Sequence, residues 1–172
     1  MRVSWLAIVG VLAASLSGCG YGIKATYDYD SRVDFSNYSS FFMLKGNSSG
    51  DPVTDERLVL DVKNMLMLKG WVEVPPGDSR AAVIVHTATD ADHTDESFYR
   101  GWGGWRWRVN DPTKVIEDYK VGTVVVTIFD ADSKQAIWRG FATDAISGNP
   151  KDAARIREAA VARMFGKFPP VQ

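Results

Sequence analysis

Residues 122–143 read GTVVVTIF-DADSK-QAIWRGFAT, two apolar segments joined by a short polar turn. Both segments are rich in β-branched and aromatic residues, which favour strands, and the Asp- and Ser-containing turn between them favours a hairpin. The first segment is apolar at almost every position, so both of its sides need to be covered. The sequence therefore predicts a strand region from Val115 to Phe129 and a returning strand from Gln135 to Thr143, which form a β-hairpin at the centre of a sheet.

Further strands are predicted on the N-terminal side of this hairpin. Residues 81–88, AAVIVHTA, form a second continuous apolar run, which is typical of a strand buried on both faces. Residues 23–29 alternate apolar and polar side chains, as a half-buried strand does. Two more strands are expected at 38–44 and, in a shorter form, at 71–74.

Two helices are predicted among these strands. The first begins at Asp51-Pro52 or at Thr54, where the side chains suit an N-cap and the first turn, and it ends at Gly70. The second begins at Asn149-Pro150, with Asn as the N-cap and Pro in the first helical position, and the FPP segment at 168–170 stops it.

This order of elements predicts an α+β fold, with a mainly antiparallel sheet and two helices packed on one face. The chain has 172 residues, of which 45% are hydrophobic and 24% are charged, enough for the core of one domain. We assign that domain to residues 23–172 and expect no second one. The formal net charge of −1 excludes the excess of Lys and Arg that a nucleic-acid partner would require.

The first residues are typical of an export signal that is removed. Arg2 provides a positive start, residues 5–16 form an apolar run, and LSGC follows at 16–19. The apolar run is shorter than the ~20 residues of a membrane-spanning helix. We therefore expect residues 1–18 to be a cleaved signal peptide that precedes the α+β domain.

The segment at 16–19 resembles the lipobox of bacterial lipoproteins, and Cys19 is the one cysteine of the chain. The resemblance implies that Cys19 becomes the first residue and carries fatty acyl chains such as palmitate, with residues 19–22 as a lipidated tether. Gly20 stands where, in Gram-negative lipoproteins, an Asp favours the inner membrane, which implies the outer membrane, facing the periplasm. The alternative is an ordinary signal peptide with a chance cysteine.

Short segments spread over nearly the whole mature chain resemble the bacterial lipoproteins that carry the domain of unknown function 4136. They are YDYD at 27–30, DFSNY at 34–38, GTVVV at 122–126, IWRGFA at 137–142 and FGKFPP at 165–170. The resemblance implies an α+β domain of the cell envelope with no established activity. It assigns no catalytic residues, and it does not cover residues 90–113.

The sequence FYRGWGGWRWR at 98–108 is the main candidate for a ligand or surface contact. The candidate side chains are Arg100, Trp102, Trp105, Arg106, Trp107 and Arg108. Trp rings stack on sugars or lie at membrane interfaces, and Arg pairs with anions, so cell-wall glycan, an anionic membrane or another envelope protein could be bound. The alternative is structural, with the rings folded over an edge or face of the sheet.

Other polar groups are expected to have structural roles. The acidic segment at 90–96 holds four carboxylates and a histidine, but its spacing does not fit an EF-hand, so we expect a solvated loop and neither metal nor cofactor. His86 lies within an apolar strand and is expected to be a hydrogen-bonded histidine of the core or of a sheet face rather than a ligand. Asp28, Asp30 and Asp34 are expected to cap turns rather than to act as acid and base.

No nucleophile or zinc-protease motif is found in the sequence. We therefore expect a non-catalytic binding or structural module of the cell envelope. A hydrolase of cell-wall or lipid material is the alternative, and a pocket that brings Asp or His together with convergent donors would favour it.

Replacing Trp102, Trp105 and Trp107 together with Ala separates the two roles of the Trp- and Arg-rich segment. We expect the structural role, in which each truncation of a buried ring costs ~3–5 kcal/mol of unfolding free energy. Denaturant unfolding measures this loss, and sedimentation with purified cell wall measures binding. Unchanged stability with lost binding would instead support recognition, and no change in either would contradict both roles.

Overall fold

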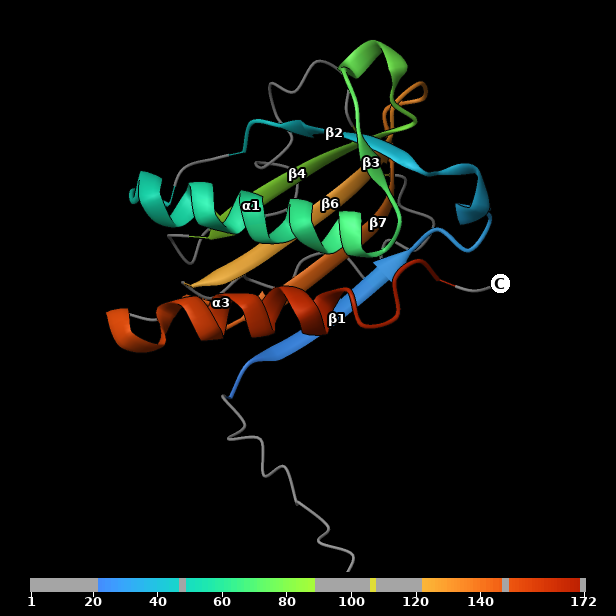
Figure 1. Cartoon of the computed structure of the whole chain (residues 1–172). Helices are drawn as coiled ribbons and strands as arrows, with labels where there is room; N and C mark the ends of the chain where they lie inside the picture. The colour runs from blue at the N-terminus through green and yellow to red at the C-terminus, as the bar shows by residue number, and fades with distance from the viewer. Residues whose placement is uncertain (1–21, 47–48, 89–105, 108–121, 147–148, 171–172) are drawn as a thin grey trace, which may run out of the picture.

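A computed structural model describes residues 22–46, 49–88, 106–107, 122–146 and 149–170. They form one sheet and two longer helices, together with the 3-10 turns η1 (Phe35–Asn37) and η2 (Pro76–Asp78) (Figure 1). The strands are β1 (Lys24–Tyr29), β2 (Ser40–Leu44), β3 (Val72–Glu73), β4 (Ala81–Ala88), β5 (Arg106–Trp107), β6 (Thr123–Asp130) and β7 (Gln135–Thr143). The helices are α1 (Pro52–Leu68) and α3 (Pro150–Met164).

The predicted hairpin, β6 and β7, lies inside the sheet, whose strand order is β1-β7-β6-β4-β2-β3, with β5 added to β7. The pairs β1/β7, β7/β6 and β6/β4 are antiparallel. The short outer strand β2 runs parallel to β4 and to β3, and α1 lies in the connection between β2 and β4. The predicted α+β class with a mainly antiparallel sheet is confirmed.

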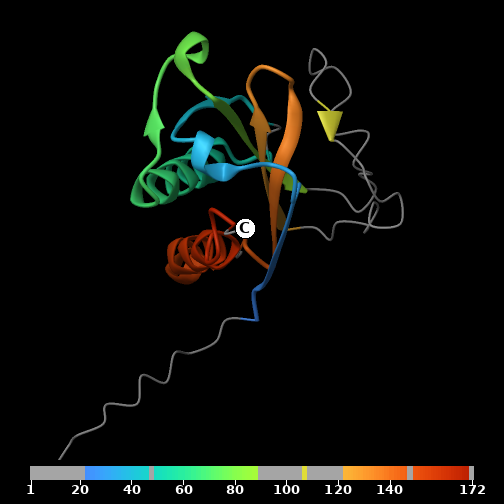
Figure 2. The ribbon, with the colours of Figure 1, turned by 90° about the vertical axis from the view of Figure 1, so that its right-hand side faces the viewer.

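Both helices cover the same face of the sheet, as predicted (Figure 2). Asp51 caps α1 by accepting a hydrogen bond from the backbone N–H of Val53, and Gly70 follows the end of the helix with φ +87°. Asn149 caps α3 by accepting from the N–H of Lys151. Local residue chemistry therefore sets the start of both helices and the end of α1.

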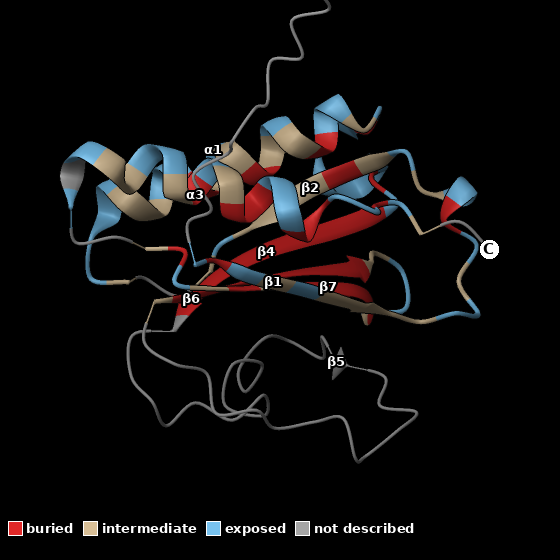
Figure 3. Ribbon diagram, turned by 90° about the horizontal axis from the view of Figure 1, so that it is seen from below, coloured by how far each residue is buried: buried red, intermediate tan, exposed pale blue. Residues whose placement is uncertain are grey.

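The main core lies between the helices and the sheet, where β4, β6 and β7 are buried along most of their length (Figure 3). Its largest fully buried side chain is Trp138 on β7. The ring centroid of Trp138 lies 4.7 Å from that of Phe165 and 5.2 Å from that of Phe168. Trp71 contacts Phe168 at the same centroid distance of 5.2 Å. This aromatic cluster joins the end of α3 to the sheet and to the segment after α1.

One ion pair links the two helices to each other. The Nε of Arg157 on α3 donates to Oδ2 of Asp61 on α1 at 2.5 Å, and the two side chains are 9% and 16% exposed. Removing only one member of an ion pair this buried is costly, because the charge of the other member stays buried without a partner. It fixes how α1 and α3 lie beside one another.

Gly140 on β7 tests how tightly this core is packed. A Cβ at this position would lie 2.4 Å from Cη2 of Trp138 and 3.2 Å from Cβ of Met164. We therefore expect Gly140→Ala to lower the unfolding free energy by roughly 1–3 kcal/mol through overpacking. Gly77→Ala is the matched control, because nothing lies within 4 Å of a Cβ there. Equal urea midpoints for the two variants would contradict the tight contact.

Candidate functional site

The residues predicted to contact a ligand or membrane fall mostly outside the described part of the chain. This applies to Cys19, to the acidic segment at 90–96, and to Arg100, Trp102, Trp105 and Arg108. Arg106 and Trp107 are described as strand β5, although nothing is described of their side chains.

Strand β5 attaches the Trp- and Arg-rich segment to β7. Arg106 pairs with Gln135 and Trp107 with Ala136, in parallel. One edge of β7 pairs with β6. Strand β5 therefore pairs with the opposite edge of β7, which also pairs with β1. The last β1 pair is Tyr29 with Trp138, and β5 occupies the next part of the same edge.

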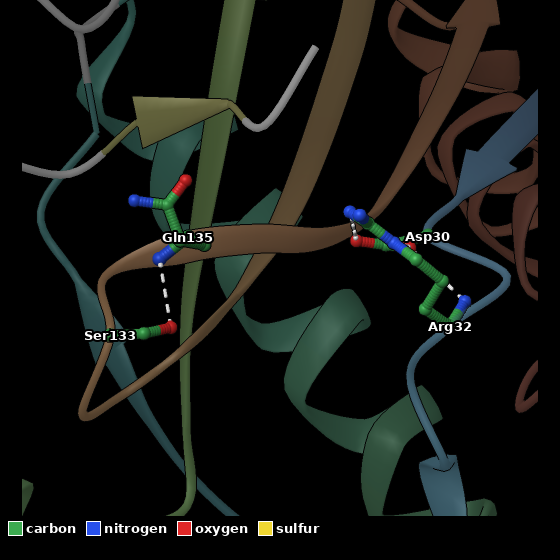
Figure 4. Close-up of polar contacts among 4 residues, drawn as sticks. All are labelled: Asp30, Arg32, Ser133 and Gln135. Carbon is green, nitrogen blue, oxygen red and sulfur yellow. Dashed lines mark hydrogen bonds and ion pairs between the residues drawn. The ribbon is translucent and has the colours of Figure 1, made fainter. Parts of the chain in front are cut away.

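Polar side chains surround this end of the sheet (Figure 4). The guanidinium of Arg32 donates to both carboxylate oxygens of Asp30, at 2.9 and 2.7 Å, directly after β1. On the β6–β7 turn, the Oγ of Ser133 accepts from the backbone N–H of Gln135 at 3.4 Å. Arg32 remains 55% exposed in its side chain, so the end of the sheet near β5 presents an accessible cation.

A second group of polar side chains lies on the face of the sheet that points away from the helices, which we call the second face. Val126 and Ile128 pack into the helix-side core, so Thr127 between them points to the second face. Thr127 pairs directly with Arg139 on β7, and its other neighbour on β4 is Ile84, two residues before His86. We call His86, Thr127 and Arg139 the polar strip.

The polar strip is almost fully buried, with exposed fractions of 1%, 0% and 2% for His86, Thr127 and Arg139. Cζ of Arg139 lies 5.9 Å from the centroid of the Phe141 ring on the same strand. Burial, together with the nearby Arg139 guanidinium, lowers the pKa of His86 from its usual 6.5 to about 4. His86 is therefore a neutral imidazole at physiological pH, and the strip carries the positive charge of Arg139.

The polar strip was only partly foreseen. The position of His86 on a sheet face is confirmed. For Thr127 and Arg139 the sequence predicts the strands but not the burial of the two side chains next to one another. The available signal was a single polar residue within an apolar strand, since period-2 spacing places Thr127 on the face opposite to that of Val126 and Ile128. That Thr127 and Arg139 are direct partners depends on the hairpin register, which includes an irregularity between Ile128 and Phe129.

Asp30 and Asp34 act as turn acceptors, as expected, whereas Asp28 lies within β1, opposite Arg139 on β7, and accepts from the backbone N–H of Tyr29 at 2.9 Å. Asp34 accepts from the backbone N–H and the Oγ of Ser36, at 3.0 and 2.7 Å, and the Ser36 hydroxyl bond is the main cause of its lowered pKa. Asp30 accepts from the backbone N–H of Arg32 at 3.1 Å. Within the described ranges, no group of three or more His, Cys, Asp or Glu side chains is placed to hold a metal ion.

Comparison with known proteins identifies the domain. The family model described as "Domain of unknown function (DUF4136)" matches residues 25–170. A search of curated proteins finds no match. In the parts of the chain that the structure describes, no helix is long and apolar enough to cross a membrane.

Three solved structures share the fold. A DUF4136 family protein from Bacteroides thetaiotaomicron has a TM-score of 0.67 at 15% identity, covering 87% of this chain and 97% of its own. A PDZ domain protein from Parabacteroides distasonis has a TM-score of 0.53 at 13% identity, covering 87% and 36%. The PelC dodecamer from Paraburkholderia phytofirmans has a TM-score of 0.51 at 13% identity, covering 87% and 99%. At these identities the similarity concerns the fold alone.

The buried imidazole of His86 predicts a loss of stability on mild acidification. The unfolded chain binds a proton near pH 6.5 and the folded protein only near pH 4, so the folded state binds fewer protons between these values. We expect the unfolding free energy to fall by about 1.4 kcal/mol per pH unit in this window, up to roughly 3 kcal/mol.

Urea unfolding of His86→Gln across the same pH range measures the effect. This variant should lose most of the slope, because it cannot take up the proton. His93→Gln, which replaces the other histidine of the chain, is the matched control and should keep the slope. An unchanged slope in His86→Gln would show that other groups titrate in this window.

Proposed function

The chain belongs to the DUF4136 family, and we propose that it is a lipid-anchored, non-catalytic binding or structural module of the bacterial cell envelope. The proposed anchor is the acylated Cys19, and the proposed location is the periplasmic side of the outer membrane. The chain uses no cofactor in this proposal, and its partners are the membrane together with cell-wall glycan or another envelope protein.

The small number of residues between Cys19 and the start of the domain is the observation that carries this proposal. The described fold begins at Gly22, and Ile23 is only 7% exposed. The carbonyl of Ile23 accepts a hydrogen bond from Nη1 of Arg163 on α3 at 2.6 Å. Four residues of extended chain span at most ~14 Å, so acyl chains on Cys19 would hold the start of β1 close to the bilayer. Several acyl chains together give stable anchoring.

The environment of the carboxylates supports a non-catalytic role. A general acid at neutral pH needs a raised carboxyl pKa. The pKa of Asp34 is instead lowered by the hydroxyl of Ser36, and that of Asp51 by the hydroxyl of Thr54. Both carboxylates stabilise turns or a helix start, which is a structural task.

The backbone pairing of β5 supports a binding role at one end of the sheet. Arg106 and Trp107 are tied to β7, so the segment that contains them has a rigid base. Arg32 and Asp30 lie on the chain leaving β1 at the same edge. Aromatic and guanidinium groups together suit the faces of sugar rings and their anionic substituents. Should the triple Trp variant keep its stability, against the structural role expected from the sequence, cell-wall glycan is the first ligand to test.

Cys19→Ser tests the anchor. We expect the variant to be either uncleaved by the lipoprotein signal peptidase or released into the soluble fraction, since the acyl chains would be lost. Fractionation and gel mobility of the tagged protein measure both outcomes. Mature-sized Cys19→Ser protein that still sediments with membranes would contradict the proposal.

A matched control changes the neighbouring residue and keeps the cysteine. Gly20→Asp should still be cleaved and acylated, but it should move from the outer to the inner membrane in a Gram-negative host. Density-gradient separation of the two membranes reports this shift. An unchanged distribution would contradict the assigned membrane while leaving the anchor itself intact.

A further inference from the structure

One surface of the domain carries all of the large, exposed hydrophobic side chains within the described residues. They are Val53, Leu60, Met67, Leu68 and Val72, with exposed fractions of 54%, 52%, 54%, 81% and 59%. Four of them lie on α1, and the fifth lies on β3 directly after it. Scattered single residues of this kind are normal, but a group on one element indicates a contact surface.

Three of these residues form a straight line along the outside of α1. Val53, Leu60 and Met67 are spaced by seven residues, which places them on one side of a helix over ~21 Å. The opposite side of α1 buries Leu58, Val62 and Leu66 in the core. The helix therefore has two apolar sides, of which only one is used within the domain. We call Val53, Leu60 and Met67 the outer stripe.

The outer stripe is open to a large partner. Both helices form the outer layer of the domain, so the outward side of α1 points away from the sheet (Figure 2). Leu68 and Val72 extend the apolar surface at the C-terminal end of the helix.

We propose that the outer stripe packs against the same stripe of a second copy of this chain, with the two α1 helices antiparallel and the two-fold axis at Leu60. In this arrangement Leu60 meets the partner's Leu60, and Val53 meets the partner's Met67. An interface of this kind uses one surface twice, as most homodimers do. It also covers the side of α1 that the domain leaves exposed.

The charges beside the outer stripe fit this pairing. Glu56 and Lys63 both lie on the side of the stripe that faces β3, at about 40° and 60° around the helix from Leu60. Glu56 comes four residues before Leu60 and Lys63 three residues after it. An antiparallel pair centred on Leu60 therefore brings Glu56 beside the partner's Lys63, and two-fold symmetry repeats the contact.

The opposite side of the stripe is compatible with the same register. Arg57 and Asn64 lie there, and the pairing brings Arg57 beside the partner's Asn64, where a hydrogen bond can form. Lys63 already pairs with Glu73 on β3, but its side chain is 33% exposed and can bridge both carboxylates. Charges of both signs beside a narrow stripe suit self-association better than a lipid surface, which prefers a broad apolar side edged by cations.

A cysteine at the two-fold axis tests the contact directly. We expect purified, detergent-solubilised Leu60→Cys protein to form a disulfide-linked dimer on mild oxidation, because the two residues face each other. Glu158→Cys on the exposed side of α3 is the matched control and should remain largely uncrosslinked. Equal crosslinking of the two variants would overturn the proposal. A disulfide-linked dimer of the unmodified chain would instead show that the thiol of Cys19 is not acylated, which contradicts the proposed anchor and not this interface.

Charge reversal tests the register. Glu56→Lys and Lys63→Glu should each weaken the dimer roughly three- to tenfold in sedimentation velocity, and the double variant should recover the affinity of the unmodified protein. Melting curves of all variants show whether the fold is kept. A double variant as weak as the single ones would overturn the antiparallel register.

Two further outcomes would overturn the second copy as the occupant. One is a monomeric unmodified chain at every concentration tested. The other is a monomer that sediments with phosphatidylglycerol vesicles in a manner abolished by Leu60→Asp, which would assign the stripe to the membrane. Concentration-dependent dimerisation that Leu60→Asp abolishes, with an unchanged melting temperature at concentrations where both proteins are monomeric, would support the proposal.

Discussion

The indole ring of Trp138 lies over the backbone of its own strand, in space that a side chain at residue 140 would fill. Because residue 140 is glycine, the ring can lie there, and α3 can approach close enough for Phe165 and Phe168 to contact it. Trp71, which follows α1, joins through Phe168. The hairpin, the end of α3 and the segment after α1 thus meet at one contact, and the layer structure depends on it. The Arg157–Asp61 pair then holds the helices beside one another.

The features predicted well from the sequence are those encoded by neighbouring residues. Asp51 and Asn149 cap their helices, Gly70 ends α1 with a positive φ, and the turn after residue 129 closes the hairpin. The strand order was beyond such reasoning, because pairing β1 with β7 or β2 with β4 joins segments far apart in the chain. No local pattern encodes which distant strand will be adjacent, and only the fold class follows from element order.

The same distinction applies to the candidate sites. The Trp- and Arg-rich segment stood out by composition. Its pairing with β7 through β5 could not be predicted, because it depends on a part of the β7 edge that β1 leaves unpaired. The polar strip could not be recognised from the sequence, because each of its three residues is one polar residue in a different, mainly apolar strand. It becomes a group only when Thr127 is placed opposite Arg139 and His86 beside them on β4. The outer stripe of α1 was obscured by the helix's core side, since both contribute apolar residues to one segment.

The pairing of β1 with β7 has a consequence for how the protein is made. Lys24 is matched with Thr143, and the carbonyl of Ile23 is bound by Arg163, so among the described residues the strand partner of β1 is one of the last elements of the chain. During synthesis from the N-terminus, residues 23–29 therefore cannot form this pairing until nearly the whole chain has emerged. Strand β1 therefore joins the sheet last, although it comes first in the chain.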